Sequence, residues 1–185
     1  MPSGAESDPA ATGGAGSDGG PAEPTTPHGR IEGAGAQDLR VALRNDHLVI
    51  PALGVDADVR AGDIEAGELT VPSDVSAVTL WSGSADLSAP TGSVLVAGHV
   101  DNRSQGPGAL HDLYLARAGD VVYLTHDSVV TRWKILGLQV VPKNQIPATL
   151  FAGPDGQRVL NLVTCGGTVT DGHYDKNVIA TAAQF

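Results

Sequence analysis

The sequence predicts an all-β domain, and three observations support that fold class. Short apolar runs recur about every ten residues, separated by Gly, Pro, Asp and Asn. The run from Val130 to Ile135 alternates apolar and polar side chains, which is typical of a half-solvated antiparallel strand. Helical periodicity is rare along the chain. The pattern therefore predicts a β-barrel or a β-sandwich with short helices in its connections.

The apolar runs place the expected strands along the chain. We expect strands at His47–Ile50, Val94–His99, Asp120–Thr125, Val129–Leu136, Val159–Cys165 and Asn177–Ala182. One or two helical turns are expected within Pro107–Leu115, and Ala118-Gly119 is expected to end them. A shorter turn is expected within Asn144–Phe151, where Pro147 limits its length. Gly83–Ala89 is expected to be a loop or a single turn.

The N-terminal part of the chain differs in composition from the rest. The chain has 185 residues, of which 41% are hydrophobic. Its first 36 residues contain nine Gly and five Pro and almost no bulky apolar side chains. Such a segment buries too little surface to offset its chain entropy. We therefore expect residues 1–37 to form a disordered Gly/Pro-rich tether and residues 38–185 to form one folded domain of ordinary size.

Composition also restricts the partners and the compartment. The formal net charge is −10, whereas nucleic acids and anionic membrane surfaces attract clustered Lys and Arg. No apolar stretch is long enough to span a bilayer, and no signal peptide follows Met1. Tethers rich in Gly and Pro are typical spacers between an anchor and a domain. We therefore expect the extracytoplasmic part of a protein whose membrane anchor is not included; the alternative is a cytosolic protein with an unusual tail.

Cys165 is the only cysteine, so the chain cannot form an internal disulfide. It ends an apolar run that begins at Val159, and the two glycines after it are expected to turn the backbone away. Another apolar run, Val94–Gly98, leads directly to His99. A thiol and an imidazole exposed at two strand ends are the parts of a cysteine nucleophile with an acid–base partner. A buried structural cysteine is the simpler alternative.

The sequence predicts no metal and no cofactor. The histidines show no His-x-His or His-x-x-x-His spacing, and one cysteine cannot build a thiolate cage for zinc. Four histidines lie beside Asp or in expected turns, and most of them are expected to be solvated: His47, His111, His126 and His173. Asp101, two residues after His99, is expected to orient the imidazole.

The segments around the thiol and the imidazole match a known pair of motifs. Asn161–Cys165 reads Asn-Leu-Val-Thr-Cys, and His99 follows an apolar strand well upstream. These motifs resemble those of the sortases, the cysteine transpeptidases of Gram-positive cell surfaces, in which the strand motif is Thr-Leu-x-Thr-Cys. Leu48–Val55 and Ala116–Tyr123 are also similar, so the resemblance covers residues 40–185. The Gly-His-Val-Asp and Thr-Cys-Gly-Gly details are most similar to the actinobacterial class F group.

The resemblance implies a fold, a reaction and a set of partners. The fold is a closed eight-stranded sortase-type β-barrel with an open groove, formed by residues 38–185 as the catalytic domain. The cysteine, here Cys165, cleaves a C-terminal Leu-Pro-x-Thr-Gly-like sorting signal of a secreted protein between Thr and Gly, forming a thioester. An amine of a peptidoglycan precursor or a pilin then resolves the thioester, with His99 as the acid–base residue. The protein is expected on the outer face of the cell membrane.

The chain departs from the family at the third catalytic position. Sortases place an arginine on the final strand, whereas the corresponding position here is Asn177. An Asn side chain can donate a hydrogen bond to a developing oxyanion, although it carries no charge. Lys176 and Arg103 are the other candidates for this role, but strand alternation points Lys176 to the opposite face from Asn177.

Two other functions are weighed against the transpeptidase. One is a non-catalytic β-barrel cell-surface module with a buried cysteine. The other is a papain-like or amidase hydrolase, which is disfavoured because such enzymes place the cysteine at a helix N-terminus and the histidine later in the chain.

Overall fold

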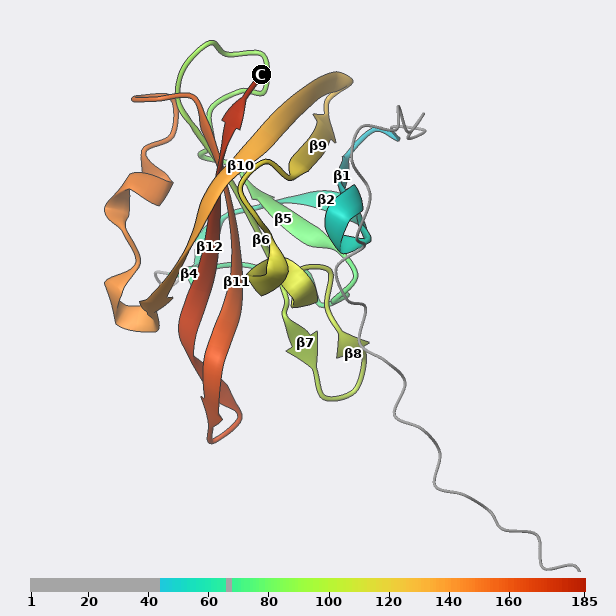
Figure 1. Cartoon of the computed structure of the whole chain (residues 1–185), viewed down its shortest axis with the longest axis vertical. Coiled ribbons are helices and arrows are strands. Elements are labelled where there is room, and N and C mark those ends of the chain that lie inside the picture. The colour runs from blue at the N-terminus through green and yellow to red at the C-terminus, as the bar shows by residue number, and fades with distance from the viewer. Residues whose placement is uncertain (1–43, 66–67) are drawn as a thin grey trace, which may run out of the picture.

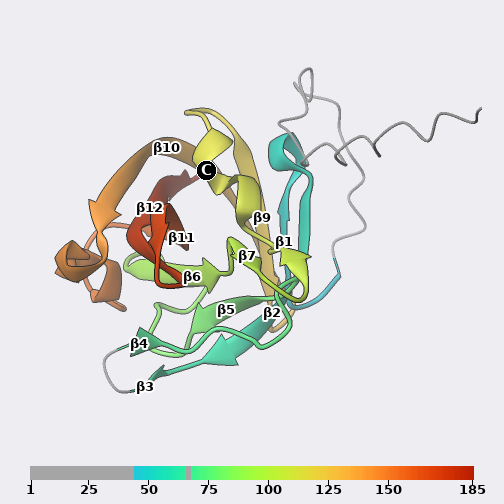
Figure 2. The same ribbon diagram turned by 90° about the horizontal axis from the view of Figure 1, so that it is seen from below.

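The computed structural model describes residues 44–65 and 68–185, which form a closed barrel of eight strands in the order β1-β2-β5-β6-β11-β12-β10-β9 (Figures 1 and 2). The barrel strands are β1 (His47–Ile50), β2 (Val55–Gly62), β5 (Val78–Trp81), β6 (Ser93–Gly98), β9 (Val121–His126), β10 (Val129–Pro142), β11 (Val159–Thr170) and β12 (His173–Gln184). The sequence-based prediction of a closed all-β barrel is confirmed. The expected tether, residues 1–37, lies outside the described residues.

Short elements fill the connections between barrel strands. Two small ribbons are formed by β3 (Ile64–Glu65) with β4 (Glu68–Leu69) and by β7 (Asp101–Asn102) with β8 (Gly106–Pro107). The helices of the described residues are 3-10 turns: η1 (Pro51–Leu53), η2 (His111–Leu115), η3 (Lys143–Gln145) and η4 (Ala148–Phe151). None of these turns has the length and hydropathy that crossing a membrane requires.

The predicted strands are present, and the structure adds two barrel strands, β2 and β5, and the short strands of the two ribbons, which were not predicted from the sequence. β2 alternates buried Val and Ala with exposed Asp and Arg, but Asp is depleted in strands and obscured the pattern. β5 has only four residues, too few for a clear period. The structure also lengthens β11 and β12 beyond their apolar cores, because paired neighbours extend strands through polar residues, and it continues β10 past Gly137 to Pro142.

Alternation along the strands divides their side chains between two apolar clusters. Leu160 and Leu162 of β11 point into the barrel, where they join the main core around the fully buried Trp133. The alternate side chains of β11, such as Asn161 and Val163, face outward. On this outer face a second cluster forms from Leu95, Leu150 and Ile179, and η4 covers part of it. Burial of large apolar side chains on both faces holds β6, β11 and β12 rigidly, which suits them to carry a site.

The expectation that two glycines end the strand after Cys165 is wrong. β11 continues to Thr170, and its pairing with β12 shifts register between Gly166 and Val169. Gly167 has a φ of 86°, a conformation that favours glycine, and a Cβ there would collide with the Asp175 carboxylate. The glycines therefore form a bulge that bends the hairpin rather than a turn that ends the strand.

Candidate active site

Cys165 and Asn177 are directly opposite one another in the antiparallel pairing of β11 and β12. Directly paired residues point to the same face of a sheet, with their Cβ atoms about 5 Å apart. Both belong to the outward-facing set, because their neighbours Thr164 and Val178 belong to the buried, inward-facing set. Cys165 is half-buried, and Asn177 is 6% exposed. The structure thus brings these two predicted residues together on one outer face.

His99 follows immediately after the last residue of β6. β6 and β11 are parallel neighbours, with Ala97 beside Val163. The pairing ends there, and its register extended by two residues predicts His99 beside Cys165, on the same outer face. The strand ends that carry the thiol and the imidazole are therefore neighbours, although they lie 66 residues apart in the sequence.

The imidazole of His99 is held by the main chain rather than by a carboxylate. Its Nε2 lies 2.9 Å from the carbonyl oxygen of Pro72, which can only accept a hydrogen bond, so Nε2 carries the proton. The expectation that Asp101 orients this ring is not what the hydrogen bonds show. The Asp101 carboxylate instead accepts a 2.6 Å hydrogen bond from the hydroxyl of Tyr174.

Thr164, which precedes Cys165, explains part of the sequence motif. Its hydroxyl donates a 2.9 Å hydrogen bond to the carbonyl of Gly98, the residue before His99. Thr164 is buried inside the barrel, where a hydroxyl without a partner would be costly. A threonine at this position therefore links the strand of the thiol to the strand of the histidine.

Tyr174 of β12 binds Asp101, two residues after His99, and no sequence-based prediction included it. The hydrogen bond to Asp101, with partial desolvation and the charges of Asp101 and Cys165, raises the pKa of Tyr174 to about 12. Its hydroxyl therefore remains protonated at physiological pH. No local pattern in the sequence marks this residue, because its partner Asp101 lies 73 residues away.

An apolar surface extends from Cys165 along the outer face. Val163 and Ile179 follow the Cys165–Asn177 pair down β11 and β12, and both belong to the outer cluster. Trp81 and Phe151 close one side of this cluster, with their rings edge to face at 5.5 Å. The thiol therefore lies at one end of an apolar surface that β5, β6, β11 and β12 provide.

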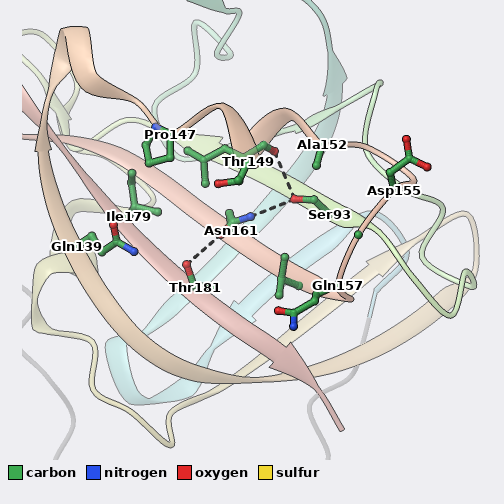
Figure 3. A pocket seen from close by; sticks show the side chains of 13 residues that line it. Ser93, Gln139, Pro147, Thr149, Ala152, Asp155, Gln157, Asn161, Ile179 and Thr181 are labelled. Atoms are coloured by element: carbon green, nitrogen blue, oxygen red, sulfur yellow. Dashed lines mark hydrogen bonds between the residues drawn. The ribbon is translucent and has the colours of Figure 1, made fainter.

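A pocket of about 440 Å³ lies further along the same face, between η4 and β11 (Figure 3). Asn161 joins two hydroxyls across its floor: its amide donates to Ser93 Oγ at 3.1 Å, and its carbonyl accepts from Thr181 Oγ1 at 3.0 Å. Asn161 is the position at which the chain departs from the Thr-Leu-x-Thr-Cys motif. At about 3.3 Å per residue, this pocket lies about 13 Å from Cys165 along β11.

The other candidates for the third catalytic role lie elsewhere. Lys176 is exposed and precedes Asn177, so alternation turns it away from the outer face. Arg103 is exposed at the turn between β7 and β8. Among the three candidates, Asn177 is the one paired with the thiol.

One group of possible metal ligands occurs among the described residues, at the opposite end of the barrel from Cys165. It consists of Asp46, His126 and Asp127. His126 is hydrogen-bonded to Asp46 at 2.7 Å, and Asp127 is 87% exposed. Both features are ordinary for a polar turn, and the group has no connection with the thiol.

Comparison with known proteins agrees with the geometry. A family profile described as sortase domain matches residues 48–185, which is most of the chain. The chain belongs to the sortase family. The sortases are cysteine transpeptidases with a strand-borne cysteine, so the family accounts for the paired strand ends described above. Among curated proteins, none matches this sequence.

Solved sortases share the fold at low sequence identity. A lid mutant of sortase A from Corynebacterium diphtheriae has a TM-score of 0.58 at 16% identity, over 75% of this chain and 68% of that chain. Sortase C-1 from Actinomyces oris has a TM-score of 0.58 at 18% identity, over 75% and 72%. A pilus-related sortase C of Group B Streptococcus reaches 0.60 at 13% identity, over 80% and 70%. At these identities the likeness shows the shared barrel.

Proposed function

We propose that this chain cleaves a Leu-Pro-x-Thr-Gly-like sorting signal between Thr and Gly and transfers the acyl part to an amine. Cys165 is the nucleophile, His99 the acid–base residue and Asn177 the oxyanion donor. The observation that carries the proposal is the adjacency of the three positions. Cys165 is paired with Asn177, and the β6–β11 register leads to His99, all at the end of an apolar outer surface.

The first half-reaction forms a thioester. The thiolate of Cys165 attacks the carbonyl carbon of the substrate threonine, because the thiolate is the reactive form of cysteine. The carbonyl oxygen becomes an oxyanion, to which the Asn177 amide donates a hydrogen bond. As the C–N bond breaks, the imidazolium of His99 protonates the departing glycine nitrogen.

The second half-reaction releases the product. An incoming amine attacks the thioester carbon and gives a proton to the now neutral His99. The C–S bond breaks, and the thiolate of Cys165 returns with imidazolium beside it. An amide bond has replaced an amide bond, so no oxidant, metal or nucleotide is consumed.

The apolar outer cluster supports the choice of substrate. The acyl part of such a signal carries Leu and Pro ahead of the scissile Thr. Val163, partly buried two residues before Cys165, and the partly buried Trp81–Phe151 pair further along the face offer apolar contacts. The pocket beneath η4 lies on the same face further from the thiol, where residues ahead of the leucine would lie.

The remaining expectations concern subclass and context. We propose class F membership from the Gly-His-Val-Asp and Thr-Cys-Gly-Gly segments. Residues 38–185 form the catalytic domain, and residues 1–37 serve as a tether to a membrane anchor on the extracytoplasmic side. The acceptors are amines of peptidoglycan precursors or pilins.

The test is a product analysis by mass spectrometry. The protein is incubated with Leu-Pro-x-Thr-Gly and Leu-Ala-x-Thr-Gly peptides, with and without an amine acceptor. The expected products are a Cys165 thioester and, with acceptor, a new amide at Thr. A folded Cys165→Ala protein that still cleaves the peptide overturns the proposal.

Thiol accessibility separates the enzyme from a non-catalytic module. Cys165 is half-buried rather than sealed in the core. We expect rapid alkylation of the native protein by a small methanethiosulfonate reagent. Resistance of the folded protein to that reagent would favour the module.

A further inference from the structure

Two hairpins extend beyond the barrel at the end that carries the candidate site (Figure 1). One is the β7–β8 ribbon, which begins two residues after His99. The other is the outer part of the β11–β12 hairpin, beyond Cys165. The thiol and the imidazole therefore lie where two separate hairpins leave the barrel, and their relative position depends on what joins those hairpins.

The sheet itself does not join them. The paired positions of β6 and β11 end at Ala97 and Val163, two residues short of His99 and Cys165. Past that point, two side-chain hydrogen bonds link the two segments in the described part of the chain. Thr164 donates to Gly98 just before the pair, and Tyr174 donates to Asp101 just beyond it.

We propose that Tyr174 and Asp101 are positioning residues, whose hydrogen bond holds the His99 segment in place against the strand of Cys165. The proposal rests on the transpeptidase mechanism above and adds to it a pair of residues outside the catalytic three. Neither residue enters a bond-making step.

Gln105 of the loop between β7 and β8 binds the segment that also holds the His99 imidazole. Gln105 donates to the carbonyl of Ser73 at 2.8 Å and accepts from the amide of Val75 at 3.2 Å. The same Pro72–Val75 segment supplies the carbonyl that holds the imidazole of His99. The ribbon and the imidazole are thus bound to the same segment, and on the solvent side Tyr174 connects the ribbon to β12.

The bond itself is suited to this role. At 2.6 Å between a phenol and a carboxylate it is short and charge-assisted, which makes it stronger than a neutral hydrogen bond. The raised pKa of Tyr174 keeps its proton available to Asp101.

The test compares wild-type protein with Tyr174→Phe, which removes the hydroxyl alone. Because small misplacements of reacting groups slow a reaction strongly, we expect kcat to fall about tenfold, with KM changed less than about twofold. The pH profile of Cys165 alkylation by iodoacetamide should shift as well, because the thiolate depends on a well-placed imidazolium. The matched control is Tyr114→Phe, a tyrosine of η2 that is 55% exposed.

A double-mutant cycle isolates the pair. Asp101→Ala should reproduce the Tyr174→Phe effect, and the double variant should be no slower than either single variant. Asp101→Asn keeps an acceptor oxygen and should recover part of the rate.

The outcomes separate this inference from the proposed function. If wild-type protein forms no thioester, the transpeptidase proposal itself fails. If wild-type protein forms it and Tyr174→Phe matches Tyr114→Phe in kcat and in alkylation profile, the positioning role is refuted. The role is also refuted if Tyr174→Phe lowers kcat only in proportion to a loss of folded protein, measured by circular dichroism.

Discussion

The two faces of the β11–β12 pair perform different tasks with alternate residues of the same strands. Inward, Leu160, Leu162 and Ala180 are fully buried in the barrel core. Outward, Cys165 is half-buried and is paired with Asn177. Because side chains alternate between faces, each strand can be held by its inner residues while its outer residues remain available for chemistry.

This difference separates stability from activity along one strand. An inward change should unfold the protein without altering the chemistry of the molecules that remain folded. An outward change at the site should do the reverse. The first three of the substitutions below test that separation, and the fourth tests a polar outer face away from the site.

The largest expected effect is that of Cys165→Ala. Removal of the nucleophile should lower the rate of peptide cleavage at least about 1,000-fold. The free energy of unfolding should change by less than about 1 kcal/mol, because the side chain is half-buried and one atom is lost. Peptide cleavage and urea unfolding are the measurements. A large loss of stability would show that the thiol belongs to the core.

Leu162→Ala should give the opposite result. The fully buried leucine leaves a cavity, which should lower the free energy of unfolding by about 3 to 4 kcal/mol. The rate per folded molecule should be nearly unchanged. The adjacent outward residue provides the control: Val163→Ala should cost only about 1 kcal/mol and should raise KM instead. Equal stability losses at both positions would contradict the division between faces.

Asn177→Ala tests the departure from the family's arginine. If the amide stabilises the oxyanion, its loss should lower kcat about 100-fold with little change in KM. Single-turnover acylation kinetics measure this directly. Lys176→Ala and Arg103→Ala serve as controls and should stay near the wild-type rate. A full rate in Asn177→Ala would remove it from the mechanism.

The smallest effect is expected on another outer face, where polar residues serve stability alone. His47 on β1 is only 3% exposed and contacts the carboxylate of Asp56 on β2, which also binds Arg44. His47 is an exception to the expectation that most of these histidines are solvated, because Asp56 and Asp58 of β2 contact its ring.

Partial desolvation acts to raise the pKa of Asp56, but the hydrogen bonds from His47 and Arg44 outweigh it, so the pKa lies below its ordinary value of 3.8. The ionised form is therefore favoured by folding, and its contribution is present above about pH 4 and lost as the pH falls through the lowered pKa. Asp56→Asn should lower the melting temperature slightly at pH 7, and this difference should shrink as the pH falls below about 4, with activity unchanged. Calorimetry across pH checks this. A constant difference at all pH values would exclude the ionic origin.

Much of the fold and part of the site could be predicted from local patterns. Val159–Cys165 and Val94–Gly98 are continuous apolar runs, and such runs predict strands because their period and β-branched content act over a few residues. The same runs led to Cys165 and His99. The polar extensions of β11 and β12 could not be predicted, because exposed residues such as Thr168 and His173 become strand only through their neighbours.

By itself the sequence determined the all-β class, the candidate nucleophile and its histidine, since each depends on residue type and short spacing. Only the tertiary structure decided that β6 and β11 are parallel neighbours, that Asn177 lies opposite the thiol, and that Tyr174 binds Asp101. These are pairings between segments far apart in the chain. Their register depends on how the whole barrel closes, which no local pattern contains.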